Sequence, residues 1–433
     1  MKKKTVYIAL SVDFIHHGHI NLIQKAKKYG SITLGLLTDK AISSQKELPY
    51  LNYHQRLQIV QNLNGIDKVV PQNEWDYSTN ILKIKPDYFV HGDDWDFNND
   101  LELKKNAIKA LKKINGKLIV IEHTKNISSS SLRDKNTNVG GTPDVRRASL
   151  KRLLKSDKFL KIIEVHSPIS AIIAEKTFNK KNKINSFYDG FWSSSLTDSI
   201  NNGRPDNESL EISKRLENIS RIFDVTTKPL IMDFDSGGRI EHFAINVQSA
   251  ERIGISAIII EDKKGAKQNS LTEKGNNQLQ DSILQFSKKI EAGKKNKLTD
   301  DFMIIARIES LIMSKPLSDA LKRAKAYIKS GVDGIMIHSK LKEPSEILKF
   351  AKAFRKNKNY DQIPLICVPS TYNQIYDYEL RDAGFNIVIY ANHLMRSSVP
   401  AMEKISNLIL KNGRTHEIEK KIASIHKALN YIS

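Results

Sequence analysis

The sequence predicts an α/β protein of two domains, a Rossmann-like doubly wound domain followed by a (β/α)8 barrel. The chain has 433 residues, and because single hydrophobic cores stop growing at about 250 to 300 residues, two cores are expected. Apolar runs alternate with segments of helical period, five before residue 133 and eight after residue 150. This alternation is typical of parallel sheets covered by helices. We therefore place the first domain at 1–133, a linker at 134–149, and the barrel with C-terminal helices at 150–433.

The first domain is expected to hold five parallel strands. Stretches such as "HINLIQKAKKYG" (19–30) and "YHQRLQIVQNL" (53–63) have helical period and separate the apolar runs, as in a doubly wound sheet. The segment "DKNTNVGGTPDVRR" (134–147) then loses apolar content and carries Gly-Gly-Thr-Pro, which predicts a linker. The expected strands are "TVYIALS" (5–11), "SITLGLLTD" (31–39), "DKVVP" (67–71), "DYFVHGDD" (87–94) and "KLIVIEHT" (117–124).

The second domain is expected to be the barrel. Eight apolar runs, each followed by a helical segment, spread over about 250 to 270 residues, the usual size of a (β/α)8 barrel. The runs are "KIIEVHS" (161–167), "FYDGFWSSS" (187–195), "PLIMDFDSG" (229–237), "SAIIIEDK" (256–263), "FMIIARIES" (302–310), "GIMIHSK" (334–340), "PLICVPS" (364–370) and "NIVIYANH" (386–393).

Groups able to bind or titrate follow these runs. In a barrel the carboxyl ends of the strands converge on one mouth, where active sites lie. Strands often end in polar residues, but that tendency favours turn formers and does not explain acids, an arginine and histidines. The groups are His166, Ser194, Asp233, Asp235, Glu261, Arg307, His338 and Asn392.

The acids among them predict a site for a hard divalent cation. Asp233 and Asp235 follow the third run, and Glu261 and Asp262 follow the fourth. Carboxylates crowded in one crevice repel each other unless a cation or a proton is bound. Oxygen ligands without a His/Cys cluster favour Mg²⁺ over zinc. Arginine and histidine donors opposite the acids would suit a small anion that chelates the metal.

Bulk composition argues against a membrane protein, a secreted protein, a disulfide-rich protein and a nucleic-acid-binding protein. A hydrophobic share of 40% without any apolar run near the roughly 18 residues of a membrane span indicates a soluble protein. The start, "MKKKTVYIALS", turns polar too soon for a signal peptide, so a cytoplasmic location is expected. Cys367 is the only cysteine, which excludes a disulfide framework. The net charge of +21 comes from scattered lysines rather than a nucleic-acid motif, so no nucleic-acid partner is expected.

The stretch "EDKKGAKQNS" (261–270) carries the first resemblance. It fits the hallmark of the phosphoenolpyruvate mutase family, namely EDK, five residues and then NS. "GFWSSSLTDS", "DFDSG", "ARIES", "IHSK" and "YANHLMRSSV" also resemble family motifs in the family's order, over residues 150–411. The resemblance implies interconversion of phosphoenolpyruvate and phosphonopyruvate with Mg²⁺, on a loop that could close over the mouth.

The resemblance also implies roles for individual residues. Asp233, Asp235 and Glu261 would bind the metal, and together with Asp206 they would form its inner and outer shells. The substrate would lie against Trp192, with its carboxylate on Ser194 and on the backbone amides of Ser195 and Leu196, and its phosphoryl group on Arg307 and His338, while Lys267 and Asn269 exclude water. The loop has no cysteine, which argues against a carbon–carbon lyase. Asn269 favours a mutase over phosphonopyruvate hydrolase, which stays the alternative.

"DFIHHGHINLI" (13–23) places His16 and His19 where the first strand passes into a helix. A helix N-terminus attracts phosphate, and Gly18 would let the backbone approach closely. Two imidazoles there could stabilise charge on a leaving pyrophosphate. Three histidines within four residues could instead bind a metal or simply lie on the surface.

Together with "HGDDW" (91–95) and "ISSSSLR" (127–133), this motif resembles the cytidylyltransferase family over residues 5–133. The resemblance implies that CTP binds here and that His16 and His19 stabilise the transition state. The family pattern differs at Leu10, His123 and Asn126. The implied nucleotide-binding residues are Ser11, Asp13, His16, His19, Lys46, Gly92, Asp94, Ser128, Ser129 and Ser130.

Taken whole, the chain resembles fusions of a cytidylyltransferase to a phosphoenolpyruvate mutase in phosphonate biosynthesis. The expected partners are small molecules, namely the two C3 acids, CTP and a phosphonate, either 2-hydroxyethylphosphonate or 2-aminoethylphosphonate. A homodimer or homotetramer is expected because family mutases exchange a helix, for which "VPAMEKISNLIL" (399–410) is a candidate. A non-catalytic protein that binds nucleotides or nucleic acid is the alternative of a different class.

Overall fold

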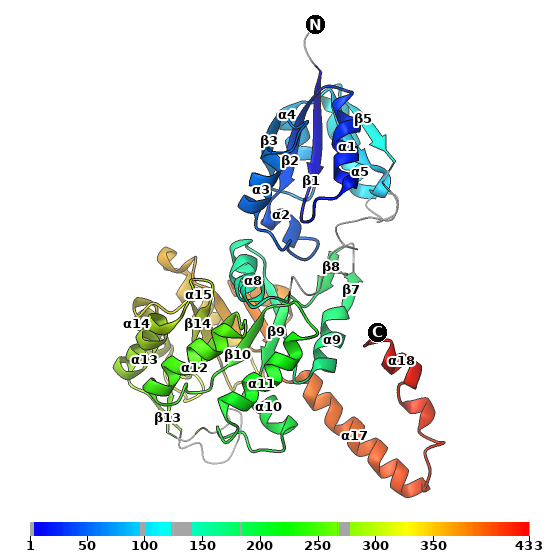
Figure 1. Ribbon diagram of the computed structural model, residues 1–433. Coiled ribbons are helices and arrows are strands. Elements are labelled where there is room, and N and C mark those ends of the chain that lie inside the picture. Colours follow the sequence, from blue (N-terminus) through cyan, green and yellow to red (C-terminus); the bar gives the residue numbers. More distant parts are fainter. Residues whose placement is uncertain are drawn as a thin grey trace. The chain divides into compact units, whose positions relative to one another are not determined.

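The computed structural model describes residues 4–95, 101–122, 124, 141–181, 184–265, 267 and 278–432 (Figure 1). The chain forms two compact units. The first comprises Met1–Gly140 with Lys155–Lys158, and the second comprises Gly141–Leu154 with Phe159–Ser433. Within the described ranges, no helix is both long enough and apolar enough to cross a membrane.

The first unit is built on a five-stranded parallel sheet with strand order β3-β2-β1-β4-β5. Strand order reverses between β1 and β4, and ligands of doubly wound sheets bind at such a switch point. The predicted doubly wound sheet is thus confirmed. The strands are β1 (Thr5–Leu10), β2 (Ser31–Leu37), β3 (Lys68–Gln72), β4 (Tyr88–Gly92) and β5 (Lys117–Ile121).

Both faces of this sheet are buried. Val6 and Ile8 of β1 join one apolar core, and Tyr7 and Ala9 join a second core on the opposite face. This division follows from the alternation of side chains along a strand. The covering elements are α1 (His17–Lys27), α2 (Asp39–Ser43), α3 (Tyr53–Gln61), α4 (Ser78–Ile84), η1 (Asp93–Trp95) and α5 (Leu101–Lys113).

The second unit is a closed barrel of eight parallel strands in the order β10-β11-β14-β15-β16-β17-β6-β9. Each of the eight predicted apolar runs supplies one strand, so the barrel prediction is confirmed. The strands are β6 (Leu160–Glu164), β9 (Gly190–Ser193), β10 (Leu230–Asp233), β11 (Ala257–Glu261), β14 (Met303–Ile308), β15 (Gly334–Ile337), β16 (Leu365–Cys367) and β17 (Ile387–Tyr390).

Helices surround this barrel, and their inward faces join the strands in one extended apolar core. Two short hairpins, β7 (Phe178–Lys181) with β8 (Ile184–Phe187) and β12 (Lys263–Lys264) with β13 (Leu279–Gln280), lie outside the barrel sheet. The surrounding helices are α9 (Pro168–Lys176), α10 (Ser195–Asn201), α11 (Ile212–Phe223), α12 (Ile240–Arg252), α13 (Ile283–Asn296), α14 (Leu317–Lys329), α15 (Ser345–Arg355), η2 (Lys358–Tyr360) and α16 (Asp377–Asp382). The chain continues after the last strand with α17 (His393–Asn412), η3 (Glu419–Lys421) and α18 (Ile425–Leu429).

One further helix, α8 (Pro143–Lys155), overlaps the segment predicted as a linker. Proline usually predicts that a helix is interrupted, but it is well tolerated in the first turn of a helix, which is where Pro143 lies. Arg146 and Leu150 of α8 are buried. The Arg146 guanidinium donates to the backbone carbonyls of Phe223 (3.1 Å) and Thr226 (2.8 Å). Most of α8 therefore belongs to the barrel unit.

Candidate active site

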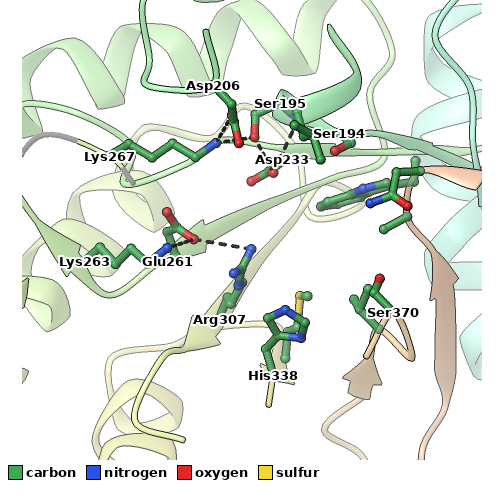
Figure 2. Close-up of a pocket in the computed structure, with 16 residues that line it drawn as sticks. Ser194, Ser195, Asp206, Asp233, Glu261, Lys263, Lys267, Arg307, His338 and Ser370 are labelled. Atoms are coloured by element: carbon green, nitrogen blue, oxygen red, sulfur yellow. Dashed lines mark hydrogen bonds and ion pairs between the residues drawn. The ribbon is translucent and has the colours of Figure 1, made fainter. Parts of the chain in front are cut away.

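A cavity opens at the carboxyl ends of the barrel strands and, together with the solvent-open space at its entrance, encloses about 540 Å³ (Figure 2). Its walls come from segments that are far apart in the sequence, as expected where eight strand ends converge. The lining residues are Trp192, Ser194, Ser195, Leu196, Asp206, Asp233, Glu261, Lys263, Lys267, Arg307, Met336, His338, Val368, Ser370, Ala391 and Asn392.

One side of the cavity gathers aspartates around a lysine. Asp233 ends β10, and its Oδ2 accepts from the hydroxyl (2.8 Å) and backbone N–H (3.4 Å) of Ser195. The ammonium of Lys267 donates to Asp206 (2.7 Å) and contacts Ser195 (Figure 2). It also contacts Asp235. Burial alone would lower the pKa of Lys267, but the surrounding carboxylates outweigh this effect and raise it. Lys267 is therefore a fixed positive charge on this side.

The other side is a chain of ion pairs. Glu261 of β11 and Arg307 of β14 are register partners, and Arg307 Nη1 lies 3.3 Å from Glu261 Oε2. Arg307 Nε donates to Glu309 (2.5 Å), and Lys263 Nζ lies 3.4 Å from both glutamates. Burial raises the pKa of Glu261 to about 7, because Arg307 and Lys263 offset only part of the lost hydration.

Three buried polar atoms facing this cavity lack a hydrogen-bond partner among the described residues. They are Nε1 of Trp192, Oε1 of Glu261 and Nδ1 of His338. Burial, together with a smaller effect of the Arg307 charge, lowers the pKa of His338 to about 3, so its imidazole is neutral. Because buried polar atoms are nearly always paired, these three atoms indicate a site for a polar ligand.

The charges around the mouth favour a bound cation. Five buried carboxylates and the partly buried Asp206 face four basic side chains, which leaves two more negative charges than positive ones when all of these groups are ionised. The carboxylates are Asp198, Asp206, Asp233, Asp235, Glu261 and Glu309, and the bases are Arg215, Lys263, Lys267 and Arg307.

The predicted metal ligands Asp233, Asp235 and Glu261 do not converge on one point. Among the residues that the structure describes, no three Asp, Glu, His or Cys side chains are grouped closely enough to hold a metal together. Mg²⁺ usually keeps several waters and takes only one or two carboxylates plus substrate oxygens. The surplus of negative charge and the unpaired Oε1 of Glu261 fit an ion held in this way.

The first unit brings His16 and His19 together at the start of α1. Their rings lie 4.0 Å apart, and His19 Nδ1 accepts from the backbone N–H of His16 (3.4 Å). A Cβ on Gly18 would come within 2.9 Å of the His16 ring, so a larger residue at this position would displace that ring. Nearby, Asp13 accepts from the N–H of Tyr50 (2.8 Å). Asp13 therefore ties the loop that precedes α1 to a second loop.

The other predicted nucleotide-binding residues are only partly described. The carbonyl of Ser11 accepts from buried Arg56, and Lys46 Nζ lies 5.3 Å from the Trp75 ring. Gly92 ends β4, which pairs with β1, so it lies at the same sheet edge as the histidines. Asn269, Ser128, Ser129 and Ser130, and the side chain of Asp94, lie outside the described residues.

Comparison with known proteins assigns the barrel. Residues 150–410 match the phosphoenolpyruvate phosphomutase family. The chain belongs to that family. The phosphoenolpyruvate phosphomutase of Tetrahymena pyriformis is 36% identical over 65% of this chain and 89% of its own length, and phosphonopyruvate hydrolase of a Variovorax species is 31% identical over 66% and 93%. A solved phosphoenolpyruvate phosphomutase from Streptomyces platensis superposes with a TM-score of 0.60 at 34% identity, over 66% of this chain and 94% of that one.

The first unit has its own relatives. Residues 11–135 match the cytidylyltransferase-like family. Glycerol-3-phosphate cytidylyltransferase of Bacillus subtilis is 27% identical over 31% of this chain and 96% of its own length. The chain is thus an N-terminal nucleotidyltransferase domain fused to a phosphoenolpyruvate phosphomutase domain, as the sequence motifs predicted.

Two residues predicted at the mouth of the phosphomutase barrel lie elsewhere. Asp262 lies outside the barrel sheet and accepts from Tyr327 (2.7 Å) and Arg323 (3.0 Å) of α14, because side chains alternate along a strand and Glu261 takes the inward position. His166 contacts Glu164 (2.6 Å) and does not line the cavity. Asp235 does not line the cavity either, but it contacts Lys267, which does. The predicted cluster of four mouth carboxylates was therefore wrong for Asp262.

Sequence reasoning also missed several groups of the phosphomutase site. Lys263 and Glu309 each lie two residues after a predicted site residue, so the two-residue period of a strand was the signal for both. Arg215 was harder to recognise because it lies on helix α11. It is spaced four and seven residues before buried Ile219 and Ile222, which marks an arginine on an inward face.

Proposed function

We propose that the barrel interconverts phosphoenolpyruvate and phosphonopyruvate. The phosphorus–oxygen bond of the enol phosphate breaks and a phosphorus–carbon bond forms at the methylene carbon, so the isomerisation consumes no water and no second substrate. The observation that carries the proposal is one cavity with unpaired polar atoms on Trp192 and His338, with an Arg307 side chain that is only 12% exposed, and with carboxylates opposite them.

Each wall of the cavity suits one part of the substrate. Arg307 and the neutral imidazole of His338 would hold the phosphoryl group by hydrogen bonds, since arginine forms two parallel bonds to such oxygens. Ser194 and the adjoining Ser195–Leu196 backbone would orient the carboxylate. Because a loosely bonded phosphoryl group reacts readily with water, positioning and exclusion of water are the main tasks of the protein.

The carboxylate side suits a metal ion. Asp233, Asp235 and Glu261 would hold Mg²⁺ largely through water, and the bound ion would supply positive charge to the oxygen end of the substrate. A phosphonopyruvate hydrolase that is 30% identical, with a TM-score of 0.58 over 66% of this chain and 94% of that chain, has been solved with oxalate and Mg²⁺. That precedent supports the assignment of a metal here.

The test uses phosphonopyruvate, the less stable isomer, incubated with the full chain and Mg²⁺ and followed by ³¹P NMR. We expect its signal to be replaced by that of phosphoenolpyruvate. Release of inorganic phosphate without phosphoenolpyruvate would instead identify a hydrolase, the activity of the relative at 31% identity. No turnover in either direction would leave only a binding function.

We also propose that the first unit transfers CMP from CTP to a small phosphonate. A phosphonate oxygen would attack the α-phosphorus, and pyrophosphate would leave beside His16 and His19, whose side chains could stabilise its charge. Release of pyrophosphate from CTP, measured with 2-hydroxyethylphosphonate and 2-aminoethylphosphonate, tests the activity and identifies the acceptor. His16→Ala should abolish this release and leave the barrel reaction unchanged.

Finally, we propose that barrels pair through α17. Met395 is its buried residue, while large apolar side chains lie exposed along the rest of the helix. Figure 1 shows α17 running away from the other barrel helices. A second copy of the chain that covers this face would give the expected homodimer or homotetramer.

A further inference from the structure

We propose that Arg215 and Asp198 are positioning residues, which hold Asp235 and the segment Ser193–Ser195 in the geometry that the mouth requires for metal and substrate. This inference rests on the proposed function of the barrel. Neither residue lines the cavity. They act from behind it, through the groups that they contact.

A buried ion pair forms the centre of this arrangement. Arg215 of α11 and Asp198 of α10 are each 2% exposed. Arg215 Nε donates to Asp198 Oδ2 (2.8 Å), and the same oxygen accepts from the Ser193 hydroxyl (2.7 Å). Two helices and the end of β9 are therefore held by one carboxylate oxygen.

The guanidinium also reaches two groups at the mouth. Its Nη1 donates to Asp235 Oδ2 (3.4 Å), and its Nη2 donates to the carbonyl of Ser193 (3.4 Å). The other carboxylate oxygen of Asp235 contacts Lys267, which lines the cavity. Arg215 thus holds one oxygen of Asp235 and leaves the other directed to the mouth.

The backbone of Asp235 makes its orientation important. Its φ is 52°, a left-handed conformation that is uncommon for a residue other than glycine. Its N–H donates to Asp233 Oδ1 (3.2 Å), and its carbonyl accepts from the N–H of Glu261 (2.8 Å). All three predicted metal-site acids therefore depend on the placement of one residue, and Arg215 is a cation that fixes it.

Stability alone does not account for this pair. Replacing a buried ion pair by apolar side chains of similar volume is often neutral or stabilising. Arg215 lies on the inward face of α11, where its neighbours Ile219 and Ile222 are already apolar. An apolar pair would satisfy the fold but would leave Asp235 and the Ser193 carbonyl without their donor. We therefore assign the pair to the organisation of the site.

The test compares the full chain with the double variant Arg215→Met/Asp198→Leu, which keeps the net charge because one cation and one anion are removed together. Binding of Mn²⁺, a probe for Mg²⁺, is measured by the loss of its free electron paramagnetic resonance signal. We expect the dissociation constant to rise about 10- to 100-fold, as for other residues that orient metal ligands. The melting temperature should stay within a few degrees of the wild type.

A matched control removes a different ion pair of the same barrel. Lys294 and Asp333 lie 2.6 Å apart, and Asp333 also accepts from the N–H of Ile304 (2.8 Å) near the amino ends of the strands, opposite the mouth. The double variant Lys294→Met/Asp333→Leu should keep wild-type Mn²⁺ binding even where its melting temperature falls. Arg215→Lys keeps the charge but cannot donate to Asp198, Asp235 and the Ser193 carbonyl at once. It should weaken Mn²⁺ binding, by a factor smaller than that of the double variant Arg215→Met/Asp198→Leu.

The outcomes separate this inference from the proposed reaction. Unchanged Mn²⁺ binding in a folded Arg215→Met/Asp198→Leu variant would overturn the positioning role, whatever the wild type catalyses. If the double variant binds Mn²⁺ more weakly and the wild type converts phosphonopyruvate into phosphate, the positioning role stands and the mutase is rejected. If the double variant does not fold, Arg215→Lys decides, and wild-type Mn²⁺ binding in that variant would reject the inference.

Discussion

At the scale of single residues, the mouth works by placing charges that water cannot screen. Arg307 lies between Glu261 and Glu309, and these two partners fix the orientation of its planar fork of donors. Burial disfavours the charged form of Arg307, but both glutamates and Asp233 outweigh this effect and raise its pKa. A permanently charged, oriented guanidinium is well suited to a phosphoryl group.

Replacing Arg307 by lysine should therefore be costly although the charge is kept. Lysine cannot make two parallel hydrogen bonds, so we expect kcat/KM for phosphonopyruvate to fall roughly 10²- to 10³-fold. The same change at Arg355, which donates to the carbonyls of Tyr360 (2.7 Å) and Ile363 (3.1 Å) outside the barrel, is the control. Equal activity of the Arg307→Lys and Arg355→Lys variants would contradict the assigned role.

In the first unit, His91 makes stability depend on pH. Its Nε2 accepts from the Trp95 indole (2.5 Å), and burial lowers its pKa from 6.5 to about 3. The unfolded chain therefore binds a proton in a range where the folded domain does not, so stability is lost as pH falls from 6.5 towards 3. From pH 7 to pH 5 the loss from this group should be about 2 kcal/mol.

Urea unfolding of a Trp192→Phe chain would measure this loss. The remaining tryptophans, Trp75 and Trp95, lie in the first unit and report its unfolding by fluorescence. Adding His91→Gln should remove most of the difference between pH 7 and pH 5. An unchanged difference would show that other groups cause the acid sensitivity.

At the scale of elements, the ends of β11 and β14 are fixed from outside the barrel. Asp262 accepts from Arg323 and Tyr327 of α14, from Gln280 of β13, and from the N–H of Glu309 (2.9 Å). Its neighbours Glu261 and Lys263 point to the mouth. A helix thereby holds the strand ends that carry the ion pairs of the site.

The hydrogen bonds and the ion pair of Asp262 should contribute strongly to the free energy of unfolding of the barrel. Arg323→Met leaves Asp262 buried without its cation, so we expect a loss of about 3 to 5 kcal/mol in unfolding free energy. Tyr327→Phe removes one hydrogen bond and should cost about 1 to 3 kcal/mol. Chemical denaturation followed by circular dichroism measures both, and the reverse order of the two effects would contradict this view of the network.

The sequence revealed strands better than it revealed side-chain directions. All eight barrel strands were predictable because each is an apolar run closed by polar groups, and Glu261 and Arg307 were found at those ends. Asp262 was misplaced because adjacent residues at a strand end face opposite ways. Arg215 was missed because helical spacing can place an arginine on an inward face without giving it a role at the site, and the helix from Pro143 was missed because a proline marks a break in a helix as readily as its first turn.

At the scale of the whole molecule, the proposed pairing of barrels depends on α17. Met402 is 61% exposed and Leu410 is 82% exposed, as expected for a face that another copy covers. Met402→Glu/Leu410→Glu should shift the chain to monomers in light scattering after size-exclusion chromatography. Ile245→Glu, at a position 65% exposed on α12, is the control and should leave the assembly intact. A monomeric wild type would reject the pairing.

The helix from Pro143 to Lys155 also determines where the chain can be divided into two separately expressed fragments. A barrel expressed from residue 150, where the family match begins, would lack Arg146 and would leave the carbonyls of Phe223 and Thr226 without their donor. Burial of unpaired carbonyls is unfavourable, so such a fragment should aggregate. Separate production of the two halves therefore calls for a division ahead of Pro143, with the whole helix left on the phosphomutase fragment.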